Sequence, residues 1–173
     1  MSTTTRTIPY RRRREDKTNY KKRIKLLLGE KPRLVIRKSL KNMVVQLVSF
    51  DAKGDKIIAS ANTKELKKYN WTFTGGNLPS AYLIGLLVGK KAVQQKHKDA
   101  IVDLGLQSPI KGSRLYAALK GAVDAGMSIP HDKETFPSDG RITGEHIAKH
   151  EKEAKFKDMT KAFEECKQKI MKG

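Results

Sequence analysis

Residues 33–62 decide the fold class, and they read RLVIRKSLKNMVVQLVSFDAKGDKIIASAN. Two short polar turns separate three runs of apolar and β-branched residues, and the second turn holds the Asp and Gly expected of a hairpin. Alternation places Leu34 and Ile36 on one face of the first run, with Arg33 and Arg37 on the other. We therefore predict an antiparallel meander whose second face turns toward solvent or nucleic acid, with strands at 33–37, 43–50 and 56–62.

The pattern downstream of the meander predicts one more strand among four helices. The run that begins at Pro79 is apolar nearly all round, which is typical of a buried helix, and Gly85 and Gly89 would let that helix lie close to the sheet. A short apolar run then predicts a fourth strand reached by a helical crossover. The fold class is therefore α/β, with a mixed sheet and helices on its faces. We expect helices at 63–69, 78–97, 113–124 and 145–172, and the strand at 100–106.

The two ends of the chain are predicted to extend from the α/β domain. Residues 1–25 form a basic arm that should be disordered or loosely helical alone, with a helix possible over 17–28. The last predicted helix carries an apolar stripe with spacings of three and four, which should dock on the body or on a neighbour. The stripe comprises Phe156, Met159, Phe163, Cys166 and Ile170. We divide the chain into an arm (1–25), an α/β domain (26–130) and a loop with a helical extension (131–173).

The chain is strongly basic, and the charge is concentrated at one end. Its 173 residues include 37 Lys and Arg against 18 Asp and Glu, for a formal net charge of +19. Residues 1–41 alone hold fifteen of the basic residues and three of the acidic ones. A cationic arm on a nearly balanced body favours a polyanionic partner, of which nucleic acid is the commonest.

Several classes of protein are disfavoured by composition. The lone Cys166 fits a reducing compartment and provides neither a disulfide nor a zinc site. The N-terminus lacks the apolar centre of a secretory signal, and the longest apolar run is about half the ~20 residues of a membrane-spanning helix. We therefore expect a soluble cytoplasmic protein with no membrane partner.

The arm is the first of three candidate RNA-binding features. Arginine offers a planar fork that matches phosphate and stacks on bases, and a thin arm can enter grooves that a folded domain cannot. The alternatives are a localisation signal and a solvated tail. The candidate contacts are Tyr10, Arg11, Arg12, Arg13, Arg14, Lys17, Tyr20, Lys22, Arg23 and Lys25.

The first strand and its turn form the second feature. Basic side chains and a serine here present several phosphate donors at one edge of a sheet. The alternative is protection of an edge strand by lysines. The candidates are Lys31, Arg33, Arg37, Lys38, Ser39 and Lys41.

Two polar loops that lead into helix N-termini form the third feature. Free backbone N–H groups at such positions favour an anion, although Gly, Ser and Asn there are also ordinary helix caps. Trp71 lies beside the first loop and could either stack on a base or belong to the core. The candidates are Trp71, Thr74, Gly75, Gly76 and Asn77, then Lys111, Gly112, Ser113 and Arg114.

Catalytic motifs are mostly missing from the sequence. It contains neither a phosphate-cradling Gly-x-x-x-x-Gly-Lys-Ser/Thr nor a Gly-x-Ser-x-Gly nucleophile motif. We expect no enzyme, cofactor, metal site or small-molecule substrate. The rival hypotheses are a general basic DNA-binding protein and a Mg²⁺-dependent nuclease of the ribonuclease-H-like group. The carboxylates available to such a nuclease are Asp51, Asp55, Asp99, Asp103 and Asp124.

Many short motifs, in order, resemble the archaeal branch of the eighteenth large-subunit ribosomal protein family, which binds 5S ribosomal RNA (rRNA). The resemblance runs from about Tyr10 to His150. Its motifs include RRRRE (11–15), KPRLV (31–35), RKS (37–39), ASA (59–61), PSAYLIGLL (79–87), LGL (104–106), KGSR (111–114), DAG (124–126), IPH (129–131) and GEHIA (144–148).

The resemblance implies a ribonuclease-H-like sheet without a catalytic centre. It also implies a place in the central protuberance of the cytoplasmic ribosome's large subunit, against 5S rRNA, 23S rRNA and neighbouring proteins. The arm and the turn at Arg37, Lys38 and Ser39 would be RNA contacts.

Overall fold

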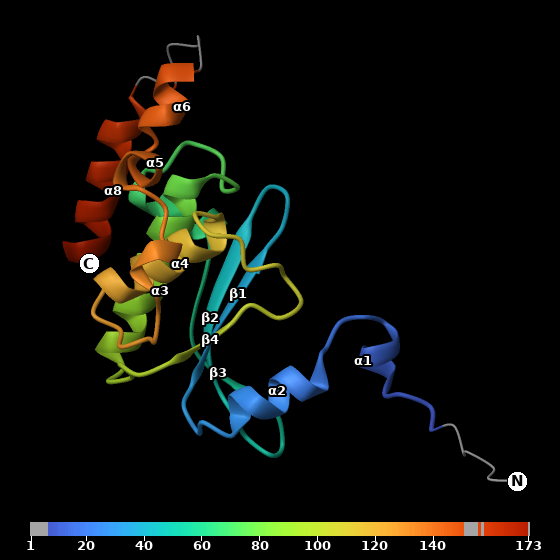
Figure 1. Cartoon of the computed structure of the whole chain (residues 1–173). Helices are drawn as coiled ribbons and strands as arrows, with labels where there is room; N and C mark the ends of the chain where they lie inside the picture. Colours follow the sequence, from blue (N-terminus) through green and yellow to red (C-terminus); the bar gives the residue numbers. More distant parts are fainter. Residues whose placement is uncertain (1–6, 151–155, 157, 173) are drawn as a thin grey trace, which may run out of the picture.

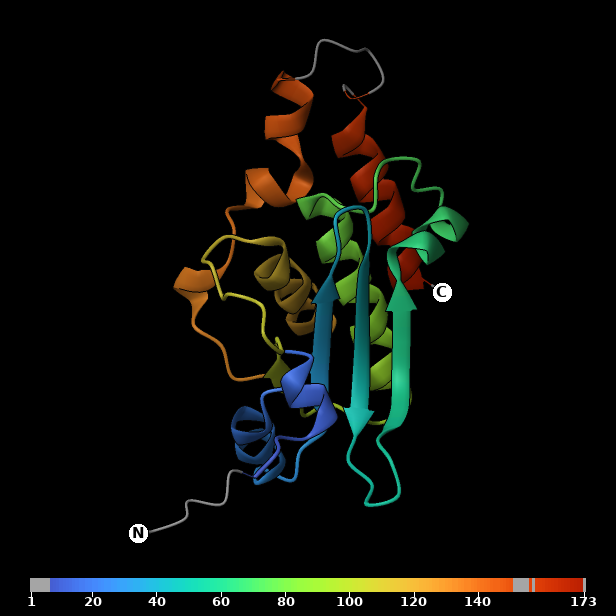
Figure 2. The same ribbon diagram turned by 90° about the vertical axis from the view of Figure 1, so that its right-hand side faces the viewer.

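The computed structural model, which describes residues 7–150, 156 and 158–172, contains a four-stranded mixed sheet (Figure 1). The longer helices lie on one face of the sheet, and a short N-terminal helix lies near the lower end of the other (Figure 2). The strands lie in the order β3-β2-β1-β4, and β1 pairs antiparallel with β2 and parallel with β4. The meander and the parallel crossover strand are therefore confirmed. The strands are β1 (Arg33–Lys38), β2 (Met43–Ser49), β3 (Lys56–Asn62) and β4 (Ile101–Asp103).

The two faces of the sheet have different surroundings. Leu34 and Ile36 are fully buried, as alternation predicts, and pack in one core cluster with residues of α3 (Leu78–Gln94) and α4 (Arg114–Asp124). Helices α3 and α4 lie behind the sheet in Figure 2, and the N-terminal segment lies in front of its lower end. The front face thus remains open along much of its length.

Two glycines of α3 allow this helix to pack closely against α4. A Cβ at Gly85 would lie 1.9 Å from the carbonyl oxygen of Ala118, and one at Gly89 would lie 3.0 Å from that of Ala122. Both carbonyls belong to α4, so the expectation that these glycines face the sheet is wrong. They allow α3 and α4 to approach closely, which a side chain at Gly85 would prevent.

The fourth strand is shorter than the predicted range of 100–106: β4 runs only from Ile101 to Asp103. The side chain of Asp103 accepts a hydrogen bond from the N–H of Gly105 at 2.8 Å, and Gly105 has φ +61°. That left-handed residue turns the chain away from the sheet. The predicted long helix also ends early, at Gln94 rather than 97.

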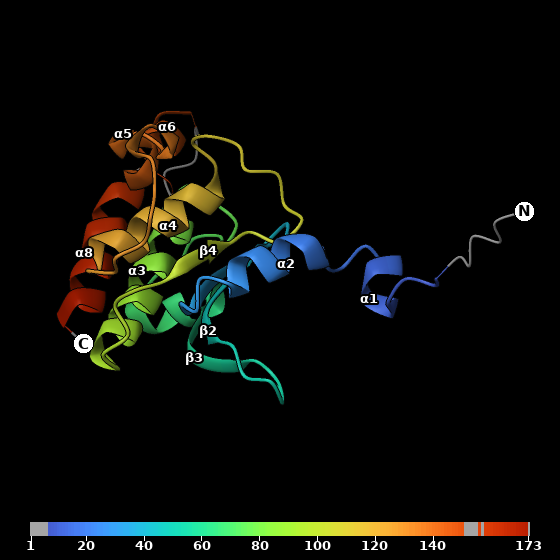
Figure 3. The same cartoon turned by 60° about the horizontal axis from the view of Figure 1, so that its bottom comes forward.

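The basic arm contains two short helices within its described part. Neither α1 (Arg11–Arg14) nor α2 (Tyr20–Leu27) contains a buried residue, and α2 lies in front of the lower end of the sheet (Figure 2). Figure 3 shows α1 reaching away from α3, α4 and α8 (Met159–Lys172). The helix anticipated over 17–28 is confirmed with shorter ends.

The C-terminal region differs from the single helix predicted for 145–172. It contains α6 (Glu145–His150) and α8, and Figure 2 shows them side by side rather than end to end. Met159, Phe163, Cys166 and Ile170 of α8 are buried in the main core, so the apolar stripe docks on the body. The loop predicted at the start of the 131–173 extension includes the 3₁₀ turn η2 (Lys133–Thr135) and is followed by α5 (Asp139–Thr143). A second 3₁₀ helix, η1 (Thr63–Tyr69), follows β3.

Candidate nucleic-acid interface

A cleft of about 330 Å³ lies between the N-terminal segment and the open face of the sheet. Arg12, Lys17, Lys22 and Arg23 line it from the arm and α2, and Arg33 and Arg37 line it from β1. Asp55 and Asp103 are the carboxylates of the lining, so six cationic side chains face two anionic ones. An excess of positive charge in a concave site attracts phosphate groups.

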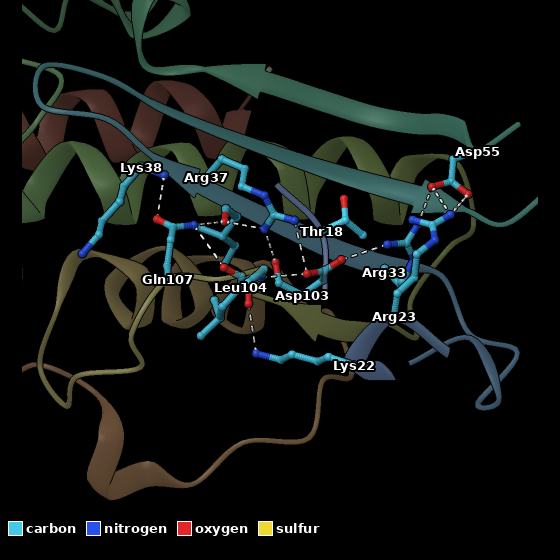
Figure 4. A network of polar contacts seen from close by, with 12 residues as sticks. Thr18, Lys22, Arg23, Arg33, Arg37, Lys38, Asp55, Asp103, Leu104 and Gln107 are labelled. Carbon is cyan, nitrogen blue, oxygen red and sulfur yellow. Dashed lines mark hydrogen bonds and ion pairs between the residues drawn. The ribbon is translucent and has the colours of Figure 1, made fainter. Parts of the chain in front are cut away.

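A buried ion-pair network forms the base of the cleft (Figure 4). Arg33 is only 3% exposed, and its Nη1 donates to Asp103 Oδ2 at 2.8 Å. The other terminal nitrogen donates to Asp55, in the loop between β2 and β3. Arg33 therefore lies on the second face of the sheet, as predicted, but its charge is neutralised beneath the arm.

Asp103 also binds Arg37, a second arginine of β1. Arg37 Nη1 donates to the backbone oxygen of Asp103 at 2.7 Å, and Nη2 approaches Asp103 Oδ1 at 3.2 Å. Burial acts to raise the pKa of Asp103, but Arg37, the Gly105 N–H and Arg33 outweigh it and hold the pKa below its ordinary value. The carboxylate is thus charged at neutral pH and fixes two guanidinium groups.

The same network attaches α2 to the sheet. Arg23 Nη2 donates to both oxygens of Asp55 at 2.9 and 3.0 Å, and Lys22 Nζ donates to the backbone oxygen of Gly105 at 3.1 Å. Asn19 begins the helix by accepting a hydrogen bond from the N–H of Lys22. Figure 4 shows Lys22 and Arg23 approaching the network from the arm. Lys22 and Arg23 are adjacent in one turn of α2, and both side chains bond to loops that follow strands of the sheet.

The four arginines of α1 remain at the surface. Arg12 Nε donates to the Thr18 hydroxyl at 2.9 Å, and Arg11 lies 3.9 Å from Glu15 in an exposed pair. The rings of Tyr10 and Tyr20 pack at 5.3 Å between centroids, and Tyr10 is three-quarters exposed. The arm therefore presents free guanidinium groups and one exposed aromatic ring next to the cleft.

The polar loop at 74–77 and the turn at 39–41 come together at the other end of β1. Arg114 Nη1 donates to the Gly76 oxygen at 2.7 Å and approaches the Ser39 and Leu40 oxygens at 3.4 and 3.5 Å. A Cβ at Gly76 would lie 2.6 Å from the Leu40 oxygen, so this approach requires glycine. Lys38, Ser39, Lys41 and Thr74 are exposed around this junction.

Several candidate contacts have structural roles in this geometry. Trp71 is 2% exposed and packs on Phe73, so its ring lies in the core and is not presented to a base. Asn77 caps α3 by accepting from the N–H of Ser80, whereas the hydroxyl of Ser113 makes no capping bond at α4. Lys111 lies 3.4 Å from Glu134 in an exposed pair, and Gly112 bonds to Thr135 through its N–H. Lys25 and Lys31 are exposed.

Sequence reasoning missed the acidic half of the site. Asp55 and Asp103 were considered only as metal ligands of a nuclease, and Gln107 was not considered. Gln107 Oε1 accepts from the Lys38 N–H, and its Nε2 donates to the Ile36 oxygen at 2.8 Å. One signal in the sequence could have indicated these carboxylates. Alternation puts Arg33 and Arg37 on the same face of a strand, and arginines that become covered there need carboxylates nearby to pair with.

The five carboxylates proposed for a nuclease do not come together. Asp55 and Asp103 bind arginines, Asp51 pairs with Lys56 at 2.7 Å, and Asp124 accepts from the Tyr82 hydroxyl at 2.8 Å. Within the part of the chain that the structure describes, His, Cys, Asp and Glu form no group of three or more that could hold a metal ion. Helices in that part are also too short or too polar to cross a membrane.

Comparison with known protein families shows which family this region resembles. The model of the family described as ribosomal large subunit proteins 60S L5 and 50S L18 matches residues 6–102 and 94–132. The matched region includes residues 6–25 of the arm, the whole sheet, the loop at 74–77 and α4. All residues that line the cleft fall within it.

Proposed function

The chain belongs to the family of ribosomal large subunit proteins 60S L5 and 50S L18, and we propose that it binds 5S rRNA and attaches it to 23S rRNA. The family is one of rRNA-binding structural proteins of the large subunit, which agrees with the resemblance found in the sequence. In this proposal the protein forms part of the central protuberance of an archaeal-type cytoplasmic ribosome, next to other large-subunit proteins. A ribonuclease-H-like sheet without a catalytic centre belongs to the same proposal, supported by the strand order β3-β2-β1-β4.

The observation that carries the proposal is the succession of basic groups from the arm, past the cleft, to the turn after β1. Arg12 and Lys22 lie at the cleft, Arg37 follows along the strand, and Lys38 and Lys41 lie at the turn. A surface of this kind can follow the backbone of a folded RNA over several phosphates. We assign RNA contact to the exposed candidates and give Arg33 and Trp71 supporting roles.

A binding assay at matched salt tests the proposal. The full-length protein should bind 5S rRNA much more tightly than duplex DNA of equal length. Equal affinity for both would support the general DNA-binding alternative, and Mg²⁺-dependent cleavage of the RNA would support the nuclease alternative.

The contribution of the arm is tested by replacing Arg11, Arg12, Arg13 and Arg14 with Ala. Each phosphate contact contributes about 0.7–0.9 to the slope of log affinity against log salt, so the variant should lose up to about 3.6 from that slope. Thermal unfolding should stay cooperative, because α1 buries none of its residues.

A matched variant removes the same charge elsewhere by replacing four exposed lysines on η1 and α8. This variant, with Lys64, Lys67, Lys68 and Lys161 changed to Ala, should lose clearly less affinity and slope. Equal losses in the two variants would mean that total charge, and not the arm, determines binding.

A further inference from the structure

The lining of the cleft beneath α2 includes apolar side chains beside the ion-pair network at its base. Val35 and Val48 contribute to the lining from the open face of the sheet, Leu26 from α2 and Leu106 from the loop after β4. Its volume of about 330 Å³ lies at the small end of the ~300–1,000 Å³ found for small-molecule sites. A site that bound only phosphate groups would leave these apolar side chains without a partner.

The cations of the lining fall into two groups. Arg23, Arg33 and Arg37 are held by Asp55 and Asp103. Arg12 and Lys22 instead bond to a hydroxyl and a backbone oxygen, so they keep their positive charge for an outside anion, while Lys17 pairs with Glu15 at the surface. The inner arginines therefore present fixed guanidinium planes, and the outer cations provide charge at the rim.

Two polar groups in the lining have hydrogen-bonding capacity of their own. Arg33 Nε is buried and has no acceptor among the described residues. Gln46, on the open face of β2, adds an amide with both donors and an acceptor. The Gln46 amide can both donate to and accept from the edge of a base, whereas a phosphate could only accept from it and would leave the apolar side chains of the lining without a partner.

We propose that the cleft receives one unstacked nucleotide of the bound RNA, with its base between the sheet and α2 and its phosphate at Arg12 and Lys22. This inference rests on the proposed RNA-binding function and adds a site for a single nucleotide to it. Proteins read unpaired nucleotides by placing the base against apolar, aromatic or guanidinium surfaces and by bonding to its edges. The arm then does more than add charge, because α2 forms the second wall of the site.

The test compares two RNA hairpins of equal length, one with a single bulged nucleotide and one fully paired. The full-length protein should bind the bulged hairpin about tenfold more tightly, the order of effect expected for one base placed in such a site. Placing 4-thiouridine at the bulge should give photocrosslinks to residues 33–57 or 101–107. The same label within the paired stem should not.

Gln46→Trp fills the cleft without changing charge, and Val44→Trp is its matched control. Val44 lies on the same strand and the same half-buried face, two residues away, but does not line the cleft. Gln46→Trp should abolish the preference for the bulge and keep the affinity for the paired hairpin, whereas Val44→Trp should keep both. Urea unfolding of each variant checks that it is folded.

The outcomes separate this inference from the function on which it rests. Binding to 5S rRNA with no bulge preference in the unmodified protein, or with crosslinks confined to residues 10–17, would overturn the nucleotide site and leave the RNA-binding proposal intact. A bulge preference that survives in folded Gln46→Trp would overturn it as well. Failure to bind 5S rRNA at all would remove the proposed function itself.

Discussion

Replacing Asp103 with Asn should destabilise the protein strongly, because this carboxylate neutralises two arginines at the base of the cleft. Its side chain is 9% exposed, and that of Arg33 is 4% exposed. Asparagine keeps the shape and one acceptor but removes the negative charge. Arg33 would then keep only Asp55, and Arg37 would keep only backbone oxygens.

The expected loss in the free energy of unfolding is about 2–3 kcal/mol. Breaking a buried ion pair by removing one partner costs about 3–5 kcal/mol, and the remaining Asp55 contact lowers that figure here. With a urea m-value of ~2 kcal/mol/M, the unfolding midpoint should fall by about 1 M. Asp99→Asn is the matched control, because Asp99 is exposed in the same segment and forms no ion pair within the described residues.

The pH dependence of this difference provides a second check. The folded-state pKa of Asp103 lies below its ordinary value of 3.8, so the charged form stabilises the fold above that pH. The stabilisation is lost as the pH falls through the lower folded-state pKa. The difference between wild type and Asp103→Asn should therefore be constant from pH 5 to 7 and shrink below about pH 4.

Urea unfolding followed by circular dichroism at several pH values measures both effects. Asp103→Asn that unfolds at the same urea concentration as Asp99→Asn would refute the argument that the network is buried and charged. A difference that persists unchanged at pH 3 would show that the lost stability comes from packing and not from the carboxylate charge.

Three further predictions concern other parts of the molecule. Gly85→Ala should lower the free energy of unfolding by about 3 kcal/mol or more in urea titrations, because the added Cβ would meet the Ala118 oxygen at 1.9 Å; an unchanged midpoint would contradict the close approach of α3 and α4. Burial raises the pKa of Cys166 to about 11, so at pH 8 the thiol should react with Ellman's reagent only as the protein unfolds, and immediate reaction in buffer would show that α8 is not docked. Arg114→Ala should speed amide hydrogen exchange at 39–42 and 74–77 but not at 22–26, since it removes a bond to the Gly76 oxygen; uniform acceleration would indicate general destabilisation.

The sheet could be predicted from sequence because its signals are local. Alternation along 33–62 and the turn at 51–55 predict β1, β2 and β3. Both signals can be recognised from residues that are close together in the sequence. The end of β4 could not be predicted in this way, because it depends on a bond from Gly105 to the Asp103 side chain. Spacings of three and four likewise fit one long helix or two shorter ones, so the separation of α6 and α8 was not visible in the stripe.

The candidate site shows a similar division. Side-chain type and charge identified the exposed cations of the arm and turn, but burial depends on what covers a face. Arg33 and Trp71 have the residue types of an RNA contact, yet α2 and its neighbouring loops cover the first, and Phe73 packs on the second. The contact of Arg114 with Gly76 joins residues 38 positions apart and leaves no periodic signal in the chain.

The two carboxylates of the cleft explain how a strongly cationic segment can have a defined position before RNA arrives. Arginines without counter-charges would repel one another and keep the arm away from the sheet. Asp55 bridges Arg23 of α2 to Arg33 of β1, and Asp103 bridges Arg33 to Arg37. The acids therefore lower the total attraction for phosphate but fix the guanidinium groups that form the inner surface of the cleft. Ordering these side chains in the free protein reduces the entropy that binding must remove, so the acidic residues favour selective binding even though they oppose the net charge.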